Sequence, residues 1–288
     1  MEKMAVIQWY PGHMAKALRQ VKENLNMVDV VLELVDARLP ESSRNPQILE
    51  VIGNKMHIMV LTKKDLADAN ATRNWVKYYE ENGLPAVAIN SNDNNNIKVI
   101  EKKINEVMAD KIARQESRGI FNQRIKVMCT GIPNVGKSTL LNRLVKKNVA
   151  QVGNKPGVTK SQQWLKAGKE LQLLDTPGIL WPKFEDPLVG KKLALTGAIK
   201  DTLYAKDDVA LYALEHFMQY NITALQERYR LSDEDLNQPI VEILLLITQR
   251  MGFKDDYDRA SERLIFDVRK GKLGRYTLDQ VPVAATEI

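Results

Sequence analysis

The stretch GIPNVGKST, residues 131–139, fits the pattern G-x-x-x-x-G-K-[ST] of loops that cradle nucleotide phosphates. The apolar run RIKVMCT (124–130) before it predicts a buried strand, and STLLNRLVKK (138–147) after it predicts a helix. In such a unit, backbone N–H groups and the helix N-terminus face the phosphates. We expect Lys137 to reach the β- and γ-phosphates and the Ser138 hydroxyl to ligate Mg²⁺.

The composition sets the class of protein within which this loop acts. The chain has 288 residues, enough for two domains, and its hydrophobic fraction of 44% is ordinary for a globular chain. A single cysteine, Cys129, excludes an internal disulfide, and three histidines leave no cluster typical of a metal site. The start MEKMAVIQWYPGH has no apolar signal core, and no run approaches the roughly 20 apolar residues of a membrane span. We expect a cytoplasmic protein.

The charge is unevenly distributed along the chain. The net charge is +6 overall, but residues 206–288 hold 11 Lys and Arg against 15 Asp and Glu, a net −4. The remainder holds 31 against 21, a net +10. A basic front part is typical of proteins with phosphate-rich partners, nucleotide or nucleic acid. On charge alone, an ordinary solvated surface explains it equally well.

Periodicity predicts the fold class. Apolar runs expected to form strands occupy 28–37, 57–65, 85–90, 124–130, 161–167 and 170–175. Helical patterns lie between them at 71–83 and 97–115. Strands that alternate with helices predict an α/β domain, with a mainly parallel sheet and helices on both faces.

The strand signal ends at about residue 185. Three amphipathic helical patterns follow, at 206–220, 233–252 and 256–272. We therefore expect two domains: residues 1–184, a nucleotide-binding domain with an N-terminal extension, and residues 185–288, a small all-α domain.

Two segments downstream of the loop have the character of a magnesium and γ-phosphate site. LQLLDTPG (171–178) places Asp175 at the end of an apolar strand, where a carboxylate can hold Mg²⁺ through water, and Gly178 can offer its N–H to the γ-phosphate. In NKPGVTKS (154–161), Thr159 lies between the phosphate loop and this strand. We expect Thr159 to complete the Mg²⁺ shell.

Two turns upstream of the loop have the character of a base-reading site. In phosphate-loop GTPases an [NT]-K-x-D turn at a strand end reads guanine, and a later Ser or Ala loop supports the O6 side. TKKD (62–65) ends one predicted strand, and INSN (89–92) ends the next. Asp65 fits the bidentate guanine contact, and the Lys63 stem fits the cover of the ring. Alone, TKKD is a weak match that also suits a solvated turn.

The order of these motifs is a circular permutation of the usual GTPase domain, which leaves the spatial neighbours of the sheet unchanged. With WYPGHMAKA (9–17), DARLPESSRNP (36–46), TKKD, GIPNVGKSTLLN and DTPGIL, the chain resembles the circularly permuted GTPases of ribosome assembly over essentially its whole length. One departure is Thr62, where Asn is commoner. We expect weaker nucleotide affinity from it, while guanine choice rests on Asp65.

Motifs and resemblance together predict one set of site residues. Nucleotide contacts are expected from Thr62, Lys63, Lys64, Asp65, Asn90, Ser91, Asn134, Val135, Gly136, Lys137, Ser138, Thr139, Thr159 and Gly178. Mg²⁺ is assigned to Ser138, Thr159 and Asp175.

The catalytic residues follow from what the switch segment lacks. Ile179 stands where signalling GTPases often have a water-orienting Gln, so intrinsic hydrolysis should be slow. The resemblance points to His13 as the residue that positions water, and to Asn134 as a ligand of K⁺ near the β/γ bridge, beside Lys137. From the residues alone, a structural or partner-contacting role explains His13 better, and a loop-tolerant asparagine explains Asn134 equally well.

The resemblance implies a monomeric GTPase acting late in 50S subunit assembly. Its partners would be the 50S particle, 23S rRNA and ribosomal proteins, with no DNA and no membrane, and the particle would stimulate hydrolysis. Because the segment after Gly178 leads into the helical domain, the γ-phosphate would reposition that domain. RYR (228–230) and RKGKLGR (269–275) are local basic clusters, and Tyr229 and Tyr276 either stack on bases or lie in the core. Alternatives are a small-molecule kinase and a nucleotide-gated RNA-binding protein with negligible hydrolysis.

Overall fold

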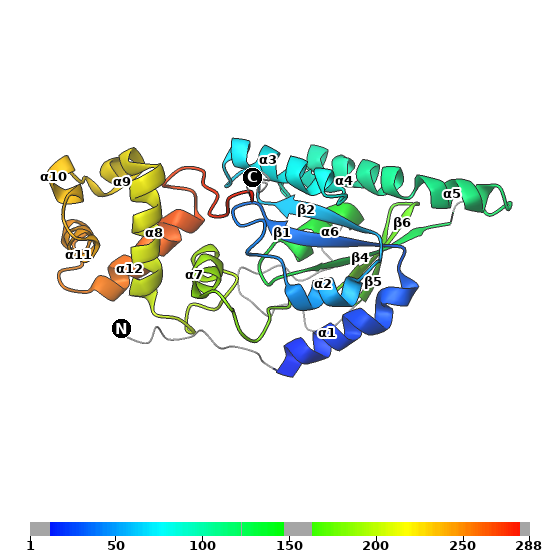
Figure 1. Cartoon of the computed structure of the whole chain (residues 1–288), viewed down its shortest axis with the longest axis horizontal. Coiled ribbons are helices and arrows are strands. Elements are labelled where there is room, and N and C mark those ends of the chain that lie inside the picture. The colour runs from blue at the N-terminus through cyan, green and yellow to red at the C-terminus, as the bar shows by residue number, and fades with distance from the viewer. Residues whose placement is uncertain (1–11, 122, 147–162, 283–288) are drawn as a thin grey trace, which may run out of the picture. The chain divides into compact units, whose positions relative to one another are not determined.

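The structure is a computed structural model that describes residues 12–121, 123–146 and 163–282. The chain divides into two compact units (Figure 1). One unit comprises the described residues of Trp9–Pro182 together with residues 279–282, and the other comprises Lys183–Leu278. Each unit has its own hydrophobic core.

The first unit is built on a six-stranded sheet with the order β3-β2-β1-β4-β6-β5. All neighbouring pairs are parallel except β5 and β6, which are joined as an antiparallel pair. The strands are β1 (Val30–Asp36), β2 (His57–Thr62), β3 (Ala86–Ala88), β4 (Ile125–Gly131), β5 (Gln163–Ala167) and β6 (Leu171–Asp175). This confirms the predicted mainly parallel α/β sheet.

Helices cover both faces of this sheet. In Figure 1, α3 and α4 lie on one face, and α1 and α2 on the other. The helical elements of the unit are α1 (Gly12–Asn24), η1 (Leu25–Met27), α2 (Pro46–Ile52), α3 (Ala69–Glu81), α4 (Asn94–Val107), α5 (Ala109–Glu116) and α6 (Lys137–Val145). Every residue of β1 is buried, which explains why its sequence is a continuous apolar run rather than an alternating one.

The helix predicted over 97–115 is two helices, α4 and α5, which meet at Met108. Helical hydrogen bonds continue across the junction, from the Met108 amide to the Ile104 carbonyl and from the Ile112 amide to the Met108 carbonyl. The interruption is therefore a bend and not a loop, and a periodicity pattern does not detect it.

The second unit is all-helical. Its helices are α7 (Pro187–Thr196), α8 (Lys206–Tyr220), α9 (Ile222–Tyr229), α10 (Asp233–Leu236), α11 (Ile240–Arg250) and α12 (Tyr257–Arg269). The pattern predicted over 233–252 is divided into α10 and α11 at Pro239, which has no amide hydrogen to continue a helix. Ser232 caps α10 through a capping box with Asp235. Among the described residues, no helix has both the length and the apolar character needed to cross a membrane.

The chain returns to the first unit after the helical unit. The Asp279 carboxylate accepts hydrogen bonds from the backbone amides of Glu41 and Ser42 at 2.9 and 2.7 Å, and the Trp75 indole N–H donates to the Asp279 carbonyl at 3.3 Å. Val281 packs against the cluster that contains Trp75. The predicted boundaries assigned all of 185–288 to the helical domain, whereas residues 279–282 pack on the nucleotide-binding unit.

Candidate functional site

The predicted phosphate loop lies at the carboxyl edge of the sheet, between β4 and α6. Gly131 has φ +151°, and a Cβ there would lie 2.4 Å from the Leu34 carbonyl oxygen, so only glycine fits beside β1. Gly136, with φ +108°, is the N-cap of α6. The free backbone amides in the first turn of α6, which begins at Lys137, therefore follow a glycine turn that lets a phosphate approach closely.

Lys137 and Asp175 are two buried titratable residues beside this loop. The Lys137 ammonium donates to the carbonyls of Gly131 and Ile132 at 3.0 and 2.8 Å. Burial lowers the pKa of Lys137 to about 8, although the negative charge of Asp175 by itself raises this pKa. Burial likewise raises the pKa of Asp175 to about 6, although the Lys137 charge lowers it. Burial therefore disfavours the charged form of both groups.

The Asp175 carboxylate fits a divalent cation. Both of its oxygens are buried without a hydrogen-bond partner in the described part of the chain. A buried carboxylate normally has partners, so this one suits a ligand, and Mg²⁺ takes one or two carboxylates together with water and phosphate oxygens. Ser138 lies in the first turn of α6, while Thr159 lies outside the described residues. No cluster of three His, Cys, Asp or Glu residues suited to a metal occurs among the described residues.

The segment after Asp175 packs directly on the phosphate loop. A Cβ on Gly178 would lie 2.7 Å from Pro133 Cα, so a larger residue would displace the loop. The Ile179 amide donates to the Gly131 carbonyl at 3.2 Å, and the Ile179 side chain is fully buried. The position that a water-orienting Gln occupies in signalling GTPases is therefore part of the core.

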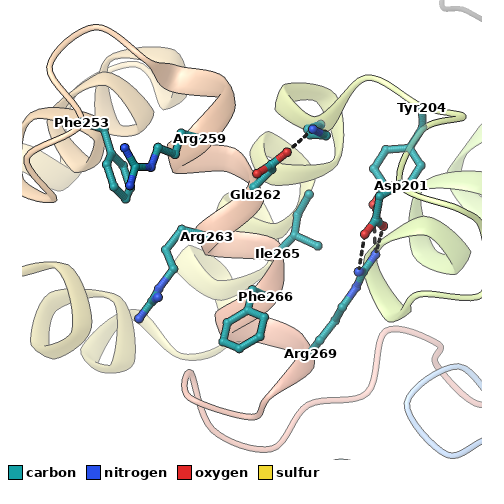
Figure 2. Close-up of a pocket in the computed structure, with 10 residues that line it drawn as sticks. Asp201, Tyr204, Phe253, Arg259, Glu262, Arg263, Ile265, Phe266 and Arg269 are labelled. Atoms are coloured by element: carbon teal, nitrogen blue, oxygen red, sulfur yellow. Dashed lines mark hydrogen bonds and ion pairs between the residues drawn. The ribbon is translucent and has the colours of Figure 1, made fainter. Parts of the chain in front are cut away.

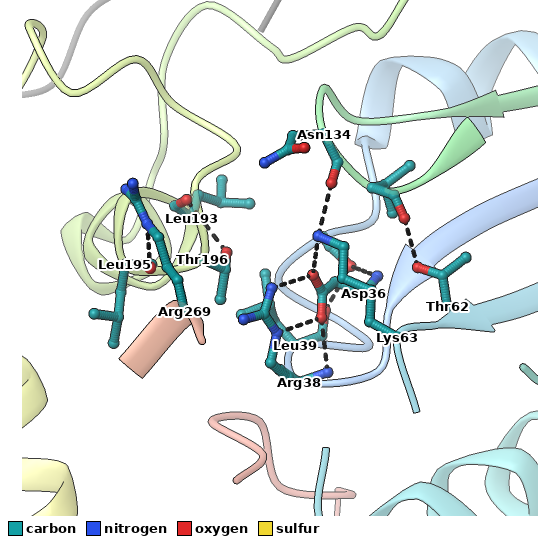
Figure 3. Close-up of polar contacts among 12 residues, drawn as sticks. Asp36, Arg38, Leu39, Thr62, Lys63, Asn134, Leu193, Leu195, Thr196 and Arg269 are labelled. Atoms are coloured by element: carbon teal, nitrogen blue, oxygen red, sulfur yellow. Dashed lines mark hydrogen bonds and ion pairs between the residues drawn. The ribbon is translucent and has the colours of Figure 1, made fainter. Parts of the chain in front are cut away.

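The TKKD turn contacts the phosphate loop through two side chains (Figure 3). The Thr62 hydroxyl donates to the Val135 carbonyl at 2.6 Å and lies 3.0 Å from the Val35 carbonyl. The Lys63 ammonium donates to the Asn134 carbonyl at 2.7 Å. The two segments are 71 or more residues apart in sequence, and the parallel register brings them to one edge of the sheet.

The second predicted base loop reaches the same place. The Lys64 amide donates to the Ile89 carbonyl at 3.1 Å, which joins the TKKD turn to the segment after β3. The Ser91 hydroxyl is buried without a partner among the described residues, and it lies 3.9 Å from the point that a Cβ on Gly136 would occupy. Asp65 is exposed at the edge of the turn, so its carboxylate is available to a ligand.

The remaining predicted residues differ in how far the structure describes them. Asn90 is half-buried, and its side-chain oxygen accepts from the Asn92 amide at 2.9 Å. Asn134 has a left-handed backbone with φ +57°, and Thr139 is half-buried in the first turn of α6. The backbone of His13 lies at the start of α1, but its side chain is outside the described structure.

Sequence reasoning missed a buried ionic group at the end of β1. Asp36 accepts from the Arg38 guanidinium at 2.9 and 2.7 Å and from the Lys63 ammonium at 3.0 Å. Although burial by itself raises the pKa of Asp36, Arg38 and Lys63 hold that pKa well below its ordinary value. The group sets the position of Lys63 beneath the phosphate loop. Asp36 and Arg38 belong to the stretch DARLPESSRNP (36–46), which indicated a family resemblance but no ionic group.

Asn45 from the same stretch was also missed. Its side-chain amide donates to the Ile179 carbonyl at 2.9 Å. The segment 36–45 therefore contacts the base-reading turn through Asp36, the switch segment through Asn45, and the C-terminal return through Ser42 and Asp279.

These features define a class of protein: a phosphate-loop GTPase in which the turns predicted to read the base precede the phosphate loop in sequence. The family described as "50S ribosome-binding GTPase" matches residues 126–248, which begin at β4 and exclude both base-reading turns. A Bacillus cereus protein named "Ribosome biogenesis GTPase A" is 49% identical over 279 residues, covering 95% of this chain and 94% of its own length. The mouse "Mitochondrial ribosome-associated GTPase 1" is 32% identical, covering 96% of this chain and 90% of its own length.

A solved structure has the same fold. The GDP-bound structure of TM YlqF is similar with a TM-score of 0.64 and 25% identity, covering 91% of this chain and 99% of that one. The chain belongs to the ribosome biogenesis GTPase A family of circularly permuted GTPases. The resemblance inferred from the motifs is thereby confirmed, and family membership supports GTP binding, GTP hydrolysis and a role in ribosome biogenesis.

Proposed function

We propose that this protein hydrolyses GTP as an assembly factor in a late step of 50S subunit biogenesis, binding 23S rRNA, and that the particle stimulates hydrolysis. The observation that carries the proposal is the convergence of TKKD, Ser91 and the phosphate loop at one edge of the sheet. That convergence supports a guanine-nucleotide site, and the ribosome-related names of the relatives support the partner.

In this site each group has a distinct role toward GTP. Asp65 takes the N–H groups of the guanine edge, and the unpaired groups left by adenine give a selectivity of roughly 10⁴–10⁵. Lys63 covers the ring while its ammonium stays on Asn134 and Asp36. Lys137 leaves its two carbonyl partners for the β- and γ-phosphates. The Gly178 amide contacts the γ-phosphate, and the Ser91 hydroxyl supports the O6 side of guanine.

The cations act at the phosphate end. Ser138, Thr159 and Asp175 would hold Mg²⁺, and a bound Mg²⁺ neutralises charge that develops on the β/γ oxygens. The Asn134 side chain would hold K⁺, which does the work of an arginine finger. Comparing GTP turnover in K⁺ and Na⁺ buffers tests this assignment, and equal rates would contradict it.

Hydrolysis needs a water-positioning group from outside the switch segment, because Ile179 is buried in the core. We assign that role to His13, which acts when the ribosomal particle is bound. His13→Ala should lower particle-stimulated turnover and leave GTP affinity intact. Full stimulated turnover in this variant would assign the water to another residue.

The helical unit supplies RNA contacts, and burial limits which of its residues can make them. Tyr229 and Tyr276 are 3% and 4% exposed, so they are core residues and do not stack on bases. Arg269 is also committed internally, because it donates to the carbonyls of Leu195 (Figure 3) and Ala194 and to the Asp201 carboxylate (Figure 2). The candidate phosphate contacts of this unit are therefore the exposed cations near the end of α12.

The decisive experiment is GTP turnover of the whole chain with 50S subunits, with whole ribosomes and with no partner. Stimulation by 50S subunits above the other two supports the proposal, and stimulation by none of them removes the ribosome from it. The buried Ile179 favours one alternative, a nucleotide-gated RNA-binding protein with negligible hydrolysis. Nucleotide-dependent binding to 50S subunits with no stimulated turnover would identify that alternative.

A further inference from the structure

An exposed aromatic ring surrounded by cations marks one face of α12 in the helical unit. Phe266 is 45% exposed, although it is a large apolar side chain. Arg263, Lys270 and Lys272 place their charged groups 5.7, 5.7 and 5.4 Å from the centre of its ring. Exposed cation–π contacts are individually weak, so they contribute little to the stability of the fold. The three cations therefore suggest a role in binding.

The charge of this patch is positive in a domain that is otherwise acidic. The neighbouring residue Asp267 is fully buried and pairs with Arg228, Arg263 and Lys272 at 2.6, 3.2 and 3.2 Å. Lys270 makes no ion pair within the described residues, so these four cations and one carboxylate leave a local charge of +3. The helical unit as a whole, residues 183–278, holds 15 Lys and Arg against 16 Asp and Glu, a net −1. A polyanion would therefore meet this domain preferentially at Phe266.

A cavity of about 460 Å³ opens beside the ring (Figure 2). Figure 2 shows Phe266 between Arg263 and Arg269 along α12, with Arg259 and Phe253 farther along the same wall. Arg259 stacks over the Phe253 ring at 4.6 Å. The two carboxylates of the lining are already paired, Asp201 with Arg269 and Glu262 with Lys206. The cavity thus offers aromatic faces and the Arg259 guanidinium to an occupant, and Arg259 has no ion pair within the described part of the chain.

We propose that Phe266 and its surrounding cations bind an unpaired RNA nucleotide, with the base stacked on the ring and the flanking phosphates on Arg263, Lys270 and Lys272. Single-stranded nucleic acid is bound by this combination of aromatic platforms and cationic tracks. The inference rests on the RNA binding proposed for this protein. It adds which residues bind the RNA and that they do so by stacking on an unpaired base. An acidic peptide would use the same cations but has no need of the ring.

The test measures binding of a fluorescent unpaired ten-nucleotide RNA to the full-length protein. Phe266→Ala should weaken binding roughly 5- to 100-fold, the loss that removing one stacking platform causes. Phe266→Trp should retain the affinity. Tyr257→Ala is the matched control, because Tyr257 is 46% exposed on the same helix and does not line the cavity. Equal affinities of Phe266→Ala and Tyr257→Ala, or no binding by the parent protein, would overturn the proposal.

Two competing ligands separate base stacking from charge alone. An RNA duplex of equal length and an oligoglutamate peptide should bind more weakly than the unpaired RNA and should respond little to Phe266→Ala. If either lost affinity on this substitution as strongly as the unpaired RNA, the patch would be a general polyanion site. Thermal unfolding of each variant separates loss of the site from loss of the fold. The proposed function is judged independently, by 50S-stimulated GTP turnover of the parent protein.

Discussion

The Lys63 ammonium donates a hydrogen bond to the Asn134 carbonyl at 2.7 Å, across 71 residues of sequence. Lys63 belongs to the base-reading turn and Asn134 to the phosphate loop. The same ammonium lies 3.0 Å from the Asp36 carboxylate, which Arg38 also holds. Lys63 therefore connects the two segments that are proposed to hold the base and the phosphates, and this connection can be tested residue by residue.

Asp65→Asn should exchange the base preference of the site. The carboxylate that pairs with guanine N–H groups becomes an amide, so GTP affinity should fall by roughly 10⁴-fold while xanthosine triphosphate gains affinity. Isothermal titration with both nucleotides measures the exchange. Asp68→Asn is the matched control, because Asp68 caps α3 and Asn caps a helix equally well. An unchanged preference for guanosine in Asp65→Asn would refute base reading by this turn.

Thr62→Val should loosen the phosphate loop. The substitution keeps the shape of a fully buried side chain but leaves the Val135 carbonyl without its donor, a cost of about 1–3 kcal/mol. Stability and GDP affinity should both fall, as measured by urea unfolding and by titration. Thr196→Val removes a similar buried hydroxyl contact in the helical unit. That control should leave GDP affinity unchanged, and equal losses of affinity in the two variants would contradict the role of Thr62.

Gly178→Ala should displace the phosphate loop from the switch segment. The added Cβ would lie 2.7 Å from Pro133 Cα, and overpacking of this kind costs about 1–3 kcal/mol. We expect the substitution to lower the affinity for a non-hydrolysable GTP analogue more than the affinity for GDP, because only the γ-phosphate uses the Gly178 amide. Titration of the variant with both nucleotides measures the difference. Equal losses for both would place the effect on the loop alone.

Asp175→Asn should stabilise the nucleotide-free protein at neutral pH. Burial raises the pKa of Asp175 from 3.8 to about 6, so the folded state binds more protons than the unfolded state between these values. Stability from this group is therefore complete below pH 3.8 and is lost as the pH rises to 6. At pH 7.5 the variant should gain on the order of 2 kcal/mol, and at pH 5 the gain should be smaller.

Urea unfolding of both proteins at pH 5 and pH 7.5, without nucleotide or Mg²⁺, measures this pH dependence. Mg²⁺-dependent GTP binding should be lost in the same variant. A gain that is the same at both pH values would show that the substitution acts through packing instead of charge.

Asp279→Ala should release the C-terminal return from the first unit. The substitution removes three hydrogen bonds, from the Glu41 and Ser42 amides and the Ser42 hydroxyl, at a cost of about 1–3 kcal/mol. Hydrogen exchange at the amides of residues 41 and 42 should accelerate. Asp258→Ala, an exposed residue of α12, serves as control. Unchanged protection at residues 41 and 42 would mean that the loop holds its conformation unaided.

The places where sequence patterns failed have physical reasons. Apolar runs predicted the six strands because the parallel strands are buried in a single sheet. The bend at Met108 was not predicted, since the apolar period continues through it. The core positions of Tyr229 and Tyr276 were left open, because aromatic residues beside cations suit a core and an RNA surface equally well.

By itself the sequence determined the local structure: a glycine-rich turn between a strand and a helix, a polar TKKD turn at a strand end, and a strand-end carboxylate at Asp175. Each depends on residues within about ten positions of one another, so spacing alone reveals it. Only the tertiary structure decided how these parts are connected. The Asp36–Lys63 pair, the Asn45 contact with Ile179 and the Asp279 contact with Ser42 span 27, 134 and 237 residues. Such contacts depend on the order and register of parallel strands, which a linear pattern does not contain.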